Sequence, residues 1–149
     1  MNPVWCLLGN FAATWYLVGL IWLIQIVHYP LFSQVGDPQF VEYERKHADR
    51  ITPVVAIPML IELVTAVWLC VEAPGTIDRR WMVFGLGLVI VAWLSTALIQ
   101  VPCHSRLGQG FDSYVHRVLV YSNWIRTIAW TARGMLMTYV VWVILDKQS

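Results

Sequence analysis

Four segments of this chain are long and apolar enough to cross a lipid bilayer, which limits the folds open to it. They cover about residues 4–28, 53–71, 81–101 and 118–145, and a spanning helix needs about 20 mostly apolar residues. Because lipid offers no hydrogen-bond partners to the backbone, each segment must satisfy its own backbone groups as a helix. The sequence therefore predicts an all-α integral membrane protein with four transmembrane helices.

Composition agrees with this class. Of 149 residues, 58% are hydrophobic and 13% are charged, whereas a soluble domain carries about 25% charged residues. The net charge of +1 and the lack of a basic face argue against a nucleic-acid binder. The length fits a single membrane domain, residues 1–149. The first segment lacks a basic start and a small-residue cleavage site, so we expect a retained span.

Short links between consecutive spans favour an up-and-down four-helix bundle. The termini and the turn at 72–80 then share one end of the bundle, here the terminal end. The longer connections, 29–52 and 102–117, share the opposite or loop end. Basic residues favour the loop end by five to three, which under the positive-inside rule places it in the cytoplasm, with the plasma (inner) membrane as the expected location. The residues counted are Arg45, Lys46, Arg50, Arg106 and Arg117 against Arg79, Arg80 and Lys147.

The first connection contains its own helical signal. Asp37 before Pro38 predicts an N-cap and a first turn. A short amphipathic loop helix is therefore expected over about 38–51, with a bend at Pro53 into the second span. One face of that helix would carry Phe40, Glu44, His47 and Ile51. In the second connection, Asp112 or Ser113 can cap the last helix.

Polar side chains converge on the loop end, where all four histidines lie. Helical stripes lead toward it on spans one, three and four, in the sets Asn10, Thr14, Gln25 and His28; Thr96, Gln100 and His104; and His116, Asn123, Thr127 and Gly134. Glu62 and Arg126 each lie about ten residues inside the loop-end boundary, so they are expected to meet. An internal salt bridge and a direct role in chemistry explain that pair equally well. Arg133 lies deeper, and we expect backbone carbonyls or an anionic or carbonyl-bearing ligand to satisfy it.

Glu44 and His47 form a Glu-x-x-His pair, a spacing that offers a carboxylate and an imidazole from one helical turn to a metal. The predicted metal ligands are His28, Glu44, His47, His104 and His116, with Glu62 and Asp112 in reserve. Histidine with carboxylate suits iron first, with zinc or manganese as alternatives; Cys103 beside His104 keeps copper and zinc open. As catalytic residues we expect Glu62 as a bridging ligand or proton carrier, and Arg126 with Asn123 to hold a polar substrate group.

Plainer interpretations stay open for each residue. Single histidines at a membrane boundary are often interfacial, and Glu44 could face solvent and pair with Lys46 or Arg50. Tyr29 is expected to be an interfacial anchor. Cys6, Cys70 and Cys103 show no metal spacing and are expected to be free buried thiols, although Cys6 and Cys70 could pair.

The segment LVYSNWIRTIAWTARGML, residues 119–136, resembles the last helix of anthrone oxygenase-like membrane proteins, a group of small four-span proteins. The resemblance rests on Asn123, Arg126 and Thr127 and on the number of spans. It implies at most an integral-membrane oxygenase of polycyclic aromatic substrates. HYPLF and YERKHADRI have no counterpart in that group, so the substrate class is not carried over.

The sequence thus predicts a metal-dependent membrane oxidoreductase or oxygenase acting on a lipophilic substrate at the loop end. A haem- or quinone-binding membrane protein is the first alternative, and it predicts a visible Soret band if haem is bound. A small transporter or assembly subunit without enzymatic activity is the second. The expected partners are a lipophilic small molecule and membrane lipid, with no nucleic acid and a homo-oligomer left open.

Overall fold

A computed structural model describes residues 3–73 and 77–147 of the chain. Within these ranges, four helical rods are long and apolar enough to cross a membrane. The first rod consists of α1 (Pro3–Leu23), the π-helical turn η1 (Ile24–His28), α2 (Tyr29–Leu31) and the 3₁₀ turn η2 (Phe32–Gln34). The second is α3 (Asp37–Val71), and the fourth is α6 (Ser113–Asp146). The third consists of α4 (Arg79–Ser95), the π-helical turn η3 (Thr96–Gln100) and α5 (Val101–Leu107).

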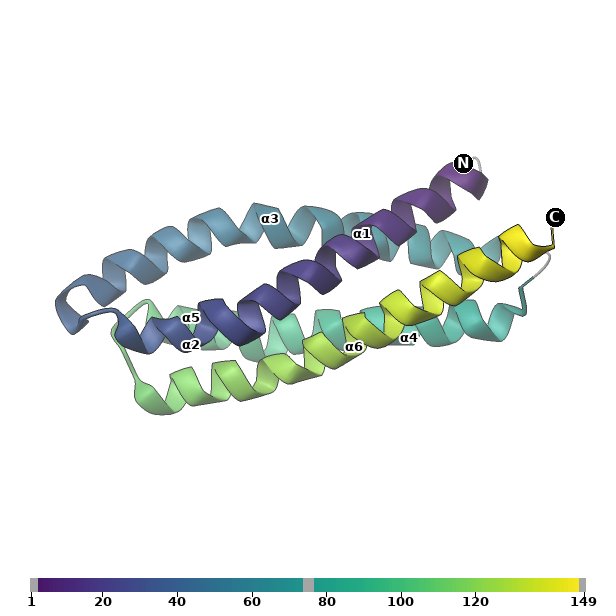
Figure 1. The fold of residues 1–149 in the computed structure, drawn as a ribbon. Helices are drawn as coiled ribbons and strands as arrows, with labels where there is room; N and C mark the ends of the chain where they lie inside the picture. The colour runs from purple at the N-terminus through teal and green to yellow at the C-terminus, as the bar shows by residue number, and fades with distance from the viewer. Residues whose placement is uncertain (1–2, 74–76, 148–149) are drawn as a thin grey trace.

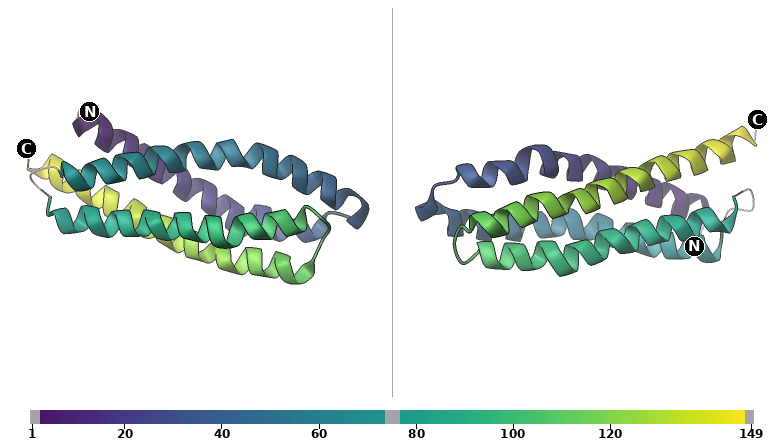
Figure 2. Two further views of the ribbon diagram at one scale, coloured as in Figure 1. Left: turned by 180° about the vertical axis from the view of Figure 1, so that it is seen from behind. Right: turned by 90° about the horizontal axis from the view of Figure 1, so that it is seen from below.

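The rods form an up-and-down bundle in which α1 packs on α3 and α6, and α4 packs on the same two helices. Figure 1 shows both ends of the chain at one end of the bundle and α2 with α5 at the other, and the two views of Figure 2 agree. The predicted integral membrane class and four-helix bundle therefore fit the structure. Residues 74–76 of the predicted turn at 72–80 lie outside the described residues.

The predicted loop helix is not a separate element. α3 runs without interruption from Asp37 to Val71 and includes Pro53 and Pro58. Gly36, and not Asp37, occupies the N-cap position. At the start of α6 the prediction is confirmed, because the Asp112 carboxylate accepts hydrogen bonds from the amides of Tyr114 and Val115 at 2.8 and 3.1 Å.

The first and third rods each contain a π-helical turn near the loop end, η1 and η3, which rotates the side chains that follow it relative to a regular α-helix. Pro30 and Pro102 each lie in the first turn of the helix that follows a π turn. A proline ring has no N–H to donate and collides with the carbonyl four residues earlier, so a wider turn just before it relieves the clash. Such turns reorient the side chains around them and are frequent at functional sites.

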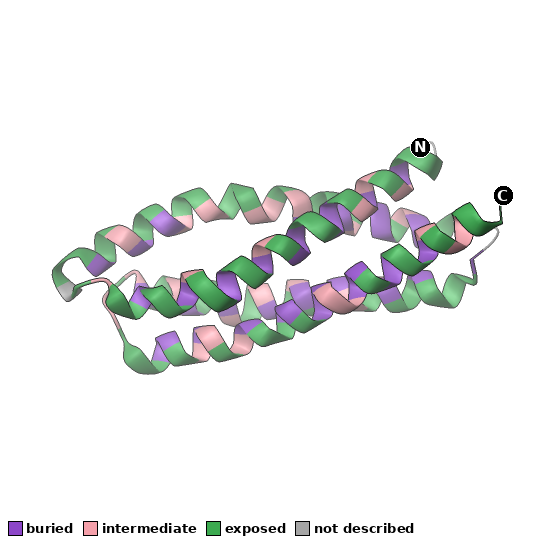
Figure 3. Ribbon diagram, in the orientation of Figure 1, coloured by how far each residue is buried: buried purple, intermediate pink, exposed green. Residues whose placement is uncertain are grey.

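The buried apolar residues form two clusters. Buried residues follow the inner faces of the rods, as Figure 3 shows. One apolar cluster, which includes Leu17, Phe32 and Leu119, lies toward the loop end. The other, which includes Cys6, Leu69 and Val140, lies toward the terminal end. All three cysteines are buried and free, as the sequence predicts.

Candidate functional site

The polar residues inside the bundle form two groups at different depths. The deeper group surrounds Glu62, a fully buried carboxylate on α3. Its Oε1 accepts hydrogen bonds from Thr14 Oγ1 at 2.7 Å and from Arg133 Nε at 3.2 Å, and its Oε2 accepts one from Trp130 Nε1 at 2.9 Å. Arg133 also donates to Asn10 Oδ1 at 2.9 Å. Every partner of this charge pair is therefore supplied by the protein, which is the arrangement that a buried ion pair needs.

The predicted pairing of Glu62 with Arg126 is wrong, and so is the expectation that Arg133 lacks an acid. The estimate of depth assumed that the second span begins at residue 53, whereas α3 begins at Asp37. Counted from the loop-end start of each helix, Glu62 lies much further into α3 than Arg126 lies into α6. Arg133 follows Arg126 by about two helical turns, so it is the arginine that comes closer to the depth of Glu62.

The second group lies at the loop end and contains four of the five predicted metal ligands. His28 Nε2 faces His47 Nδ1 at 2.9 Å, and His104 Nδ1 lies 2.5 Å from Glu44 Oε1. The rings of His47 and His104 are 5.3 Å apart between centroids. These side chains come from η1, α3 and α5, three different rods. Below, the set of His28, Glu44, His47 and His104 is called the loop-end cluster.

Two atoms of the loop-end cluster have no hydrogen-bond partner although they are buried. They are Glu44 Oε2 and His47 Nε2, which belong to the predicted Glu-x-x-His pair. Glu44 is 1% exposed, so the interpretation of Glu44 as a solvent-facing residue is wrong. A buried polar atom without a partner costs about 1–3 kcal/mol and calls for an explanation such as a bound ion or water.

His116, the fifth predicted ligand, is held apart from the cluster. Its Nε2 donates to the backbone carbonyl of Tyr29 at 2.8 Å. The fully buried ring of Phe32 contacts all four histidines, with centroid distances between 5.1 and 6.3 Å. Asp112, kept in reserve as a ligand, is used as the cap of α6.

Tyr29 is a member of this site that the sequence did not reveal. The predicted interfacial anchor is 3% exposed, and its hydroxyl joins two predicted site residues. Arg126 Nη2 donates to the Tyr29 oxygen at 3.2 Å, and that oxygen lies 2.9 Å from His104 Nε2. With a neutral His104, the donors run in one direction from Arg126 through Tyr29 and His104 to Glu44. The residues around Tyr29 in the sequence do not distinguish a tyrosine that anchors the protein at the membrane surface from one that forms hydrogen bonds inside the bundle.

Arg126 itself is buried and is held by neutral groups. Asn123 Oδ1 accepts from its Nε at 2.9 Å, and Thr96 Oγ1 accepts from Nη1 at 3.3 Å. Asn123 is fixed in turn, because its Nδ2 donates to Gln25 Oε1 at 2.9 Å. Over residues 3–73 and 77–147, Arg126 forms no ion pair. The two predicted catalytic residues of α6 thus lie together, and Glu62 lies elsewhere.

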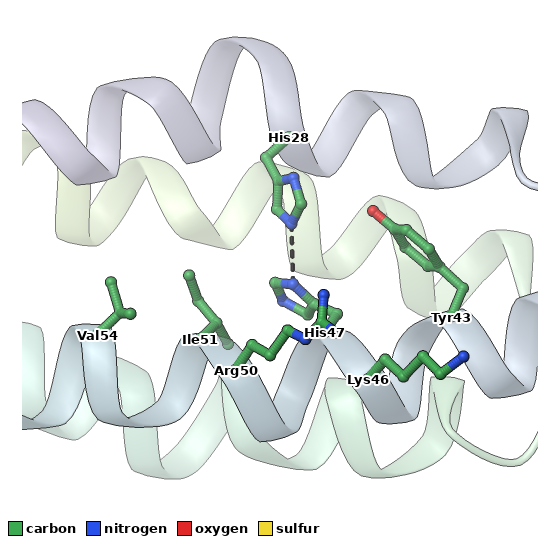
Figure 4. A pocket seen from close by; sticks show the side chains of 7 residues that line it. All are labelled: His28, Tyr43, Lys46, His47, Arg50, Ile51 and Val54. Atoms are coloured by element: carbon green, nitrogen blue, oxygen red, sulfur yellow. Dashed lines mark hydrogen bonds between the residues drawn. The ribbon is translucent and has the colours of Figure 1, made fainter.

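Two cavities adjoin the site. One of 400 Å³ opens beside His28 and His47, with Lys46 and Arg50 among its lining residues. Figure 4 shows these two imidazole rings joined by a hydrogen bond in the cavity lining. The other, of 220 Å³, lies between α3 and the third rod and includes Tyr29, His104 and Arg126 in its lining.

Among the described residues, no three His, Cys, Asp or Glu side chains are arranged as a metal site. The ligand atoms of the loop-end cluster instead contact one another in pairs.

Comparison with known proteins identifies no relative: no family model, no curated protein and no solved structure matches this chain.

Proposed function

We propose that this integral membrane protein is a metal-dependent oxidoreductase whose loop-end cluster holds the metal. The ligands would be Glu44 and His47 from α3 with His28 and His104 from the neighbouring rods. Iron is the first candidate for this set of imidazole and carboxylate ligands, and zinc, manganese and copper are alternatives. The substrate would be lipophilic, and the loop end would face the cytoplasm of a plasma (inner) membrane, as the bias of basic residues favours.

The observation that carries the proposal is the pair of buried atoms without partners, Glu44 Oε2 and His47 Nε2. Both are atoms that a metal would bind, they lie on one helical turn, and two more imidazoles lie in contact with them or with their residues. A bound cation would satisfy both atoms and would offset the cost of burying the Glu44 charge.

The distances within the cluster are compatible with ligation after small movements. Metal–nitrogen bonds of roughly 2.0–2.1 Å place two ligand nitrogens on one ion about 3.0–3.4 Å apart. His28 Nε2 and His47 Nδ1 are 2.9 Å apart, so an ion bound between these two atoms would need the rings to separate by about half an ångström or less. An ion bound at His47 Nε2 would leave this contact in place, and the contact would then orient the His47 ring. His116 is not among the proposed ligands because the Tyr29 carbonyl already occupies its Nε2.

The remaining polar groups support chemistry next to the metal. A metal of this kind would supply Lewis acidity or electron transfer. Tyr29 and His104 connect the 220 Å³ cavity to Glu44 through hydrogen bonds, so the Tyr29 hydroxyl would orient the His104 ring for ligation. Arg126, held by Asn123, would position the polar group of the substrate. Glu62 is not needed in this scheme, since Arg133 neutralises it.

Elemental analysis and an optical spectrum of the detergent-purified protein test the proposal. We expect the wild type to contain at least about one transition-metal ion per protein chain. We expect His47→Ala to contain none. His116→Gln is the matched control, because it changes a histidine of the same end that lies outside the proposed ligand set and should keep its metal. A metal-free wild type, or equal loss in both variants, would refute the ligand set, and a Soret band would favour the haem alternative.

A further inference from the structure

We infer that the cavity of 220 Å³ between α3 and the third rod is a lateral binding site for the head of a membrane-soluble molecule that carries one strong acceptor oxygen, a carbonyl or an oxyanion. The inference rests on the proposed function only in treating that molecule as the substrate. The binding site itself is argued from the cavity and its polar groups.

The cavity has one apolar side and one polar side. Ile24, Val55 and Met59 supply part of its apolar lining, whereas Tyr29 and Arg126 contribute polar groups. Small-molecule sites are usually apolar cavities with a few polar groups that fix the orientation of the ligand.

The cavity opens on the outer surface of the bundle. Thr52 on α3 and Val101 on α5 line it and are exposed, while Met59 and Arg126 line it and are buried. Because both rods are candidate membrane spans, the opening faces the surroundings of the bundle and not its ends. A volume of 220 Å³ is below the roughly 300–1,000 Å³ of sites that enclose a whole drug-sized ligand, so this cavity suits a head group whose tail stays in the bilayer.

The lining contains one buried donor without a partner and one buried cation without an anion. The Nε1 of Trp93 is buried and has no hydrogen-bond partner. Arg126 is 4% exposed and is surrounded by neutral oxygens of Asn123, Thr96 and Tyr29. A buried guanidinium without an anion retains a large electrostatic attraction for one. An acceptor oxygen would give the Trp93 N–H a partner, and an oxyanion would also be attracted by Arg126. Both effects favour an oxygen-bearing head over a plain hydrocarbon.

Binding of two probes to the protein in lipid nanodiscs tests the inference, with the apparent Kd obtained from ligand-induced stabilisation against thermal unfolding. The probes are 2-decyl-1,4-benzoquinone, which offers a carbonyl, and dodecanoate, which offers an oxyanion. Dodecylbenzene is the control without oxygen. We expect one or both probes to bind and dodecylbenzene to bind at least about tenfold more weakly, since a hydrogen bond to a charged group contributes about that factor.

Three variants locate the site. Trp93→Phe keeps an aromatic side chain and removes the N–H, so it should weaken probe binding by about fivefold to tenfold, as should Arg126→Gln. Trp124→Phe, a matched change at an exposed position of α6, should have no effect. Ala56→Leu fills the cavity from α3 and should abolish binding of both probes.

Failure of either proposal can be recognised separately. Ala56→Leu replaces no proposed metal ligand, so it should lose the probes while keeping the metal content of the wild type. Binding that is absent for both probes, equal for dodecylbenzene, or unchanged in Trp93→Phe and Ala56→Leu would overturn the inference, whatever the metal content of the protein.

Discussion

Glu62 on α3 and Arg133 on α6 form a buried ion pair inside the bundle, nearer its terminal end, with 3.2 Å between Oε1 and Nε. Thr14, Trp130 and Asn10 complete its hydrogen bonds. The pair thus joins three helices at one depth, which fixes the register of α1, α3 and α6 relative to one another. We expect this pair to hold together the bundle on which the loop-end cluster is built.

Breaking this pair from one side should strongly destabilise the protein. Glu62→Gln leaves Arg133 buried and uncompensated, and Arg133→Met does the same to Glu62, so each should lower the free energy of unfolding by about 3–5 kcal/mol. The double variant should lose less than the sum of the two. Denaturant titration of the detergent-solubilised protein measures this, with Glu72→Gln at the exposed end of α3 as the control. Additive losses would show that the two side chains do not act as a pair.

Gly85 on α4 leaves the space that the Arg133 side chain occupies, so we expect the stability of the protein to depend on this glycine. A Cβ at this position would collide with the Arg133 guanidinium and lie 3.0 Å from Leu136. Gly85→Ala should therefore destabilise the protein, by about 1–3 kcal/mol if the core is overpacked in the usual way. Gly87→Ala, two positions further on the same helix, meets nothing within 4 Å and should be neutral or stabilising by up to about 1 kcal/mol. Similar unfolding free energies for the two variants would contradict the close packing of the Arg133 guanidinium against Gly85.

Removal of the Tyr29 hydroxyl should weaken metal binding without removing a ligand. Tyr29→Phe deletes the group that orients the His104 ring through its Nε2. Outer partners of metal ligands typically contribute about 10–100-fold to affinity, so we expect a loss of that size in a chelator competition titration. Tyr121→Phe, an exposed tyrosine on α6, is the matched control. Equal metal affinities for Tyr29→Phe and the wild type would show that the Tyr29 hydroxyl does not support the metal ligands.

The sequence was sufficient for the class of fold because the apolar length of each span and the short connections leave few arrangements. It also predicted that His28, Glu44, His47 and His104 lie together, since all four lie near one end of their spans. The continuous α3 was missed because Pro53 reads locally as a boundary, although a proline can lie inside a helix whose neighbours support it.

Details within the site depended on helix register and could not be predicted from spacing. The π turns before Pro30 and Pro102 shift the side chains of η1 and η3 away from the positions that a regular helix would give. Tyr29 therefore points into the bundle, and His116 meets its backbone carbonyl instead of the other histidines. The partner of Glu62 was assigned to the wrong arginine because the depth of a residue follows from where its helix begins.

X-ray absorption spectroscopy at the edge of the bound metal tests the central claim most directly. The account predicts a first shell of nitrogen and oxygen ligands only, with the multiple scattering of at least two imidazole rings, and the same spectrum in the metal-retaining control His116→Gln. A sulfur shell at about 2.3 Å would implicate Cys103 and contradict the ligand set. A spectrum of a hydrated, adventitiously bound ion without imidazole scattering would contradict the claim that the loop-end cluster is a metal site.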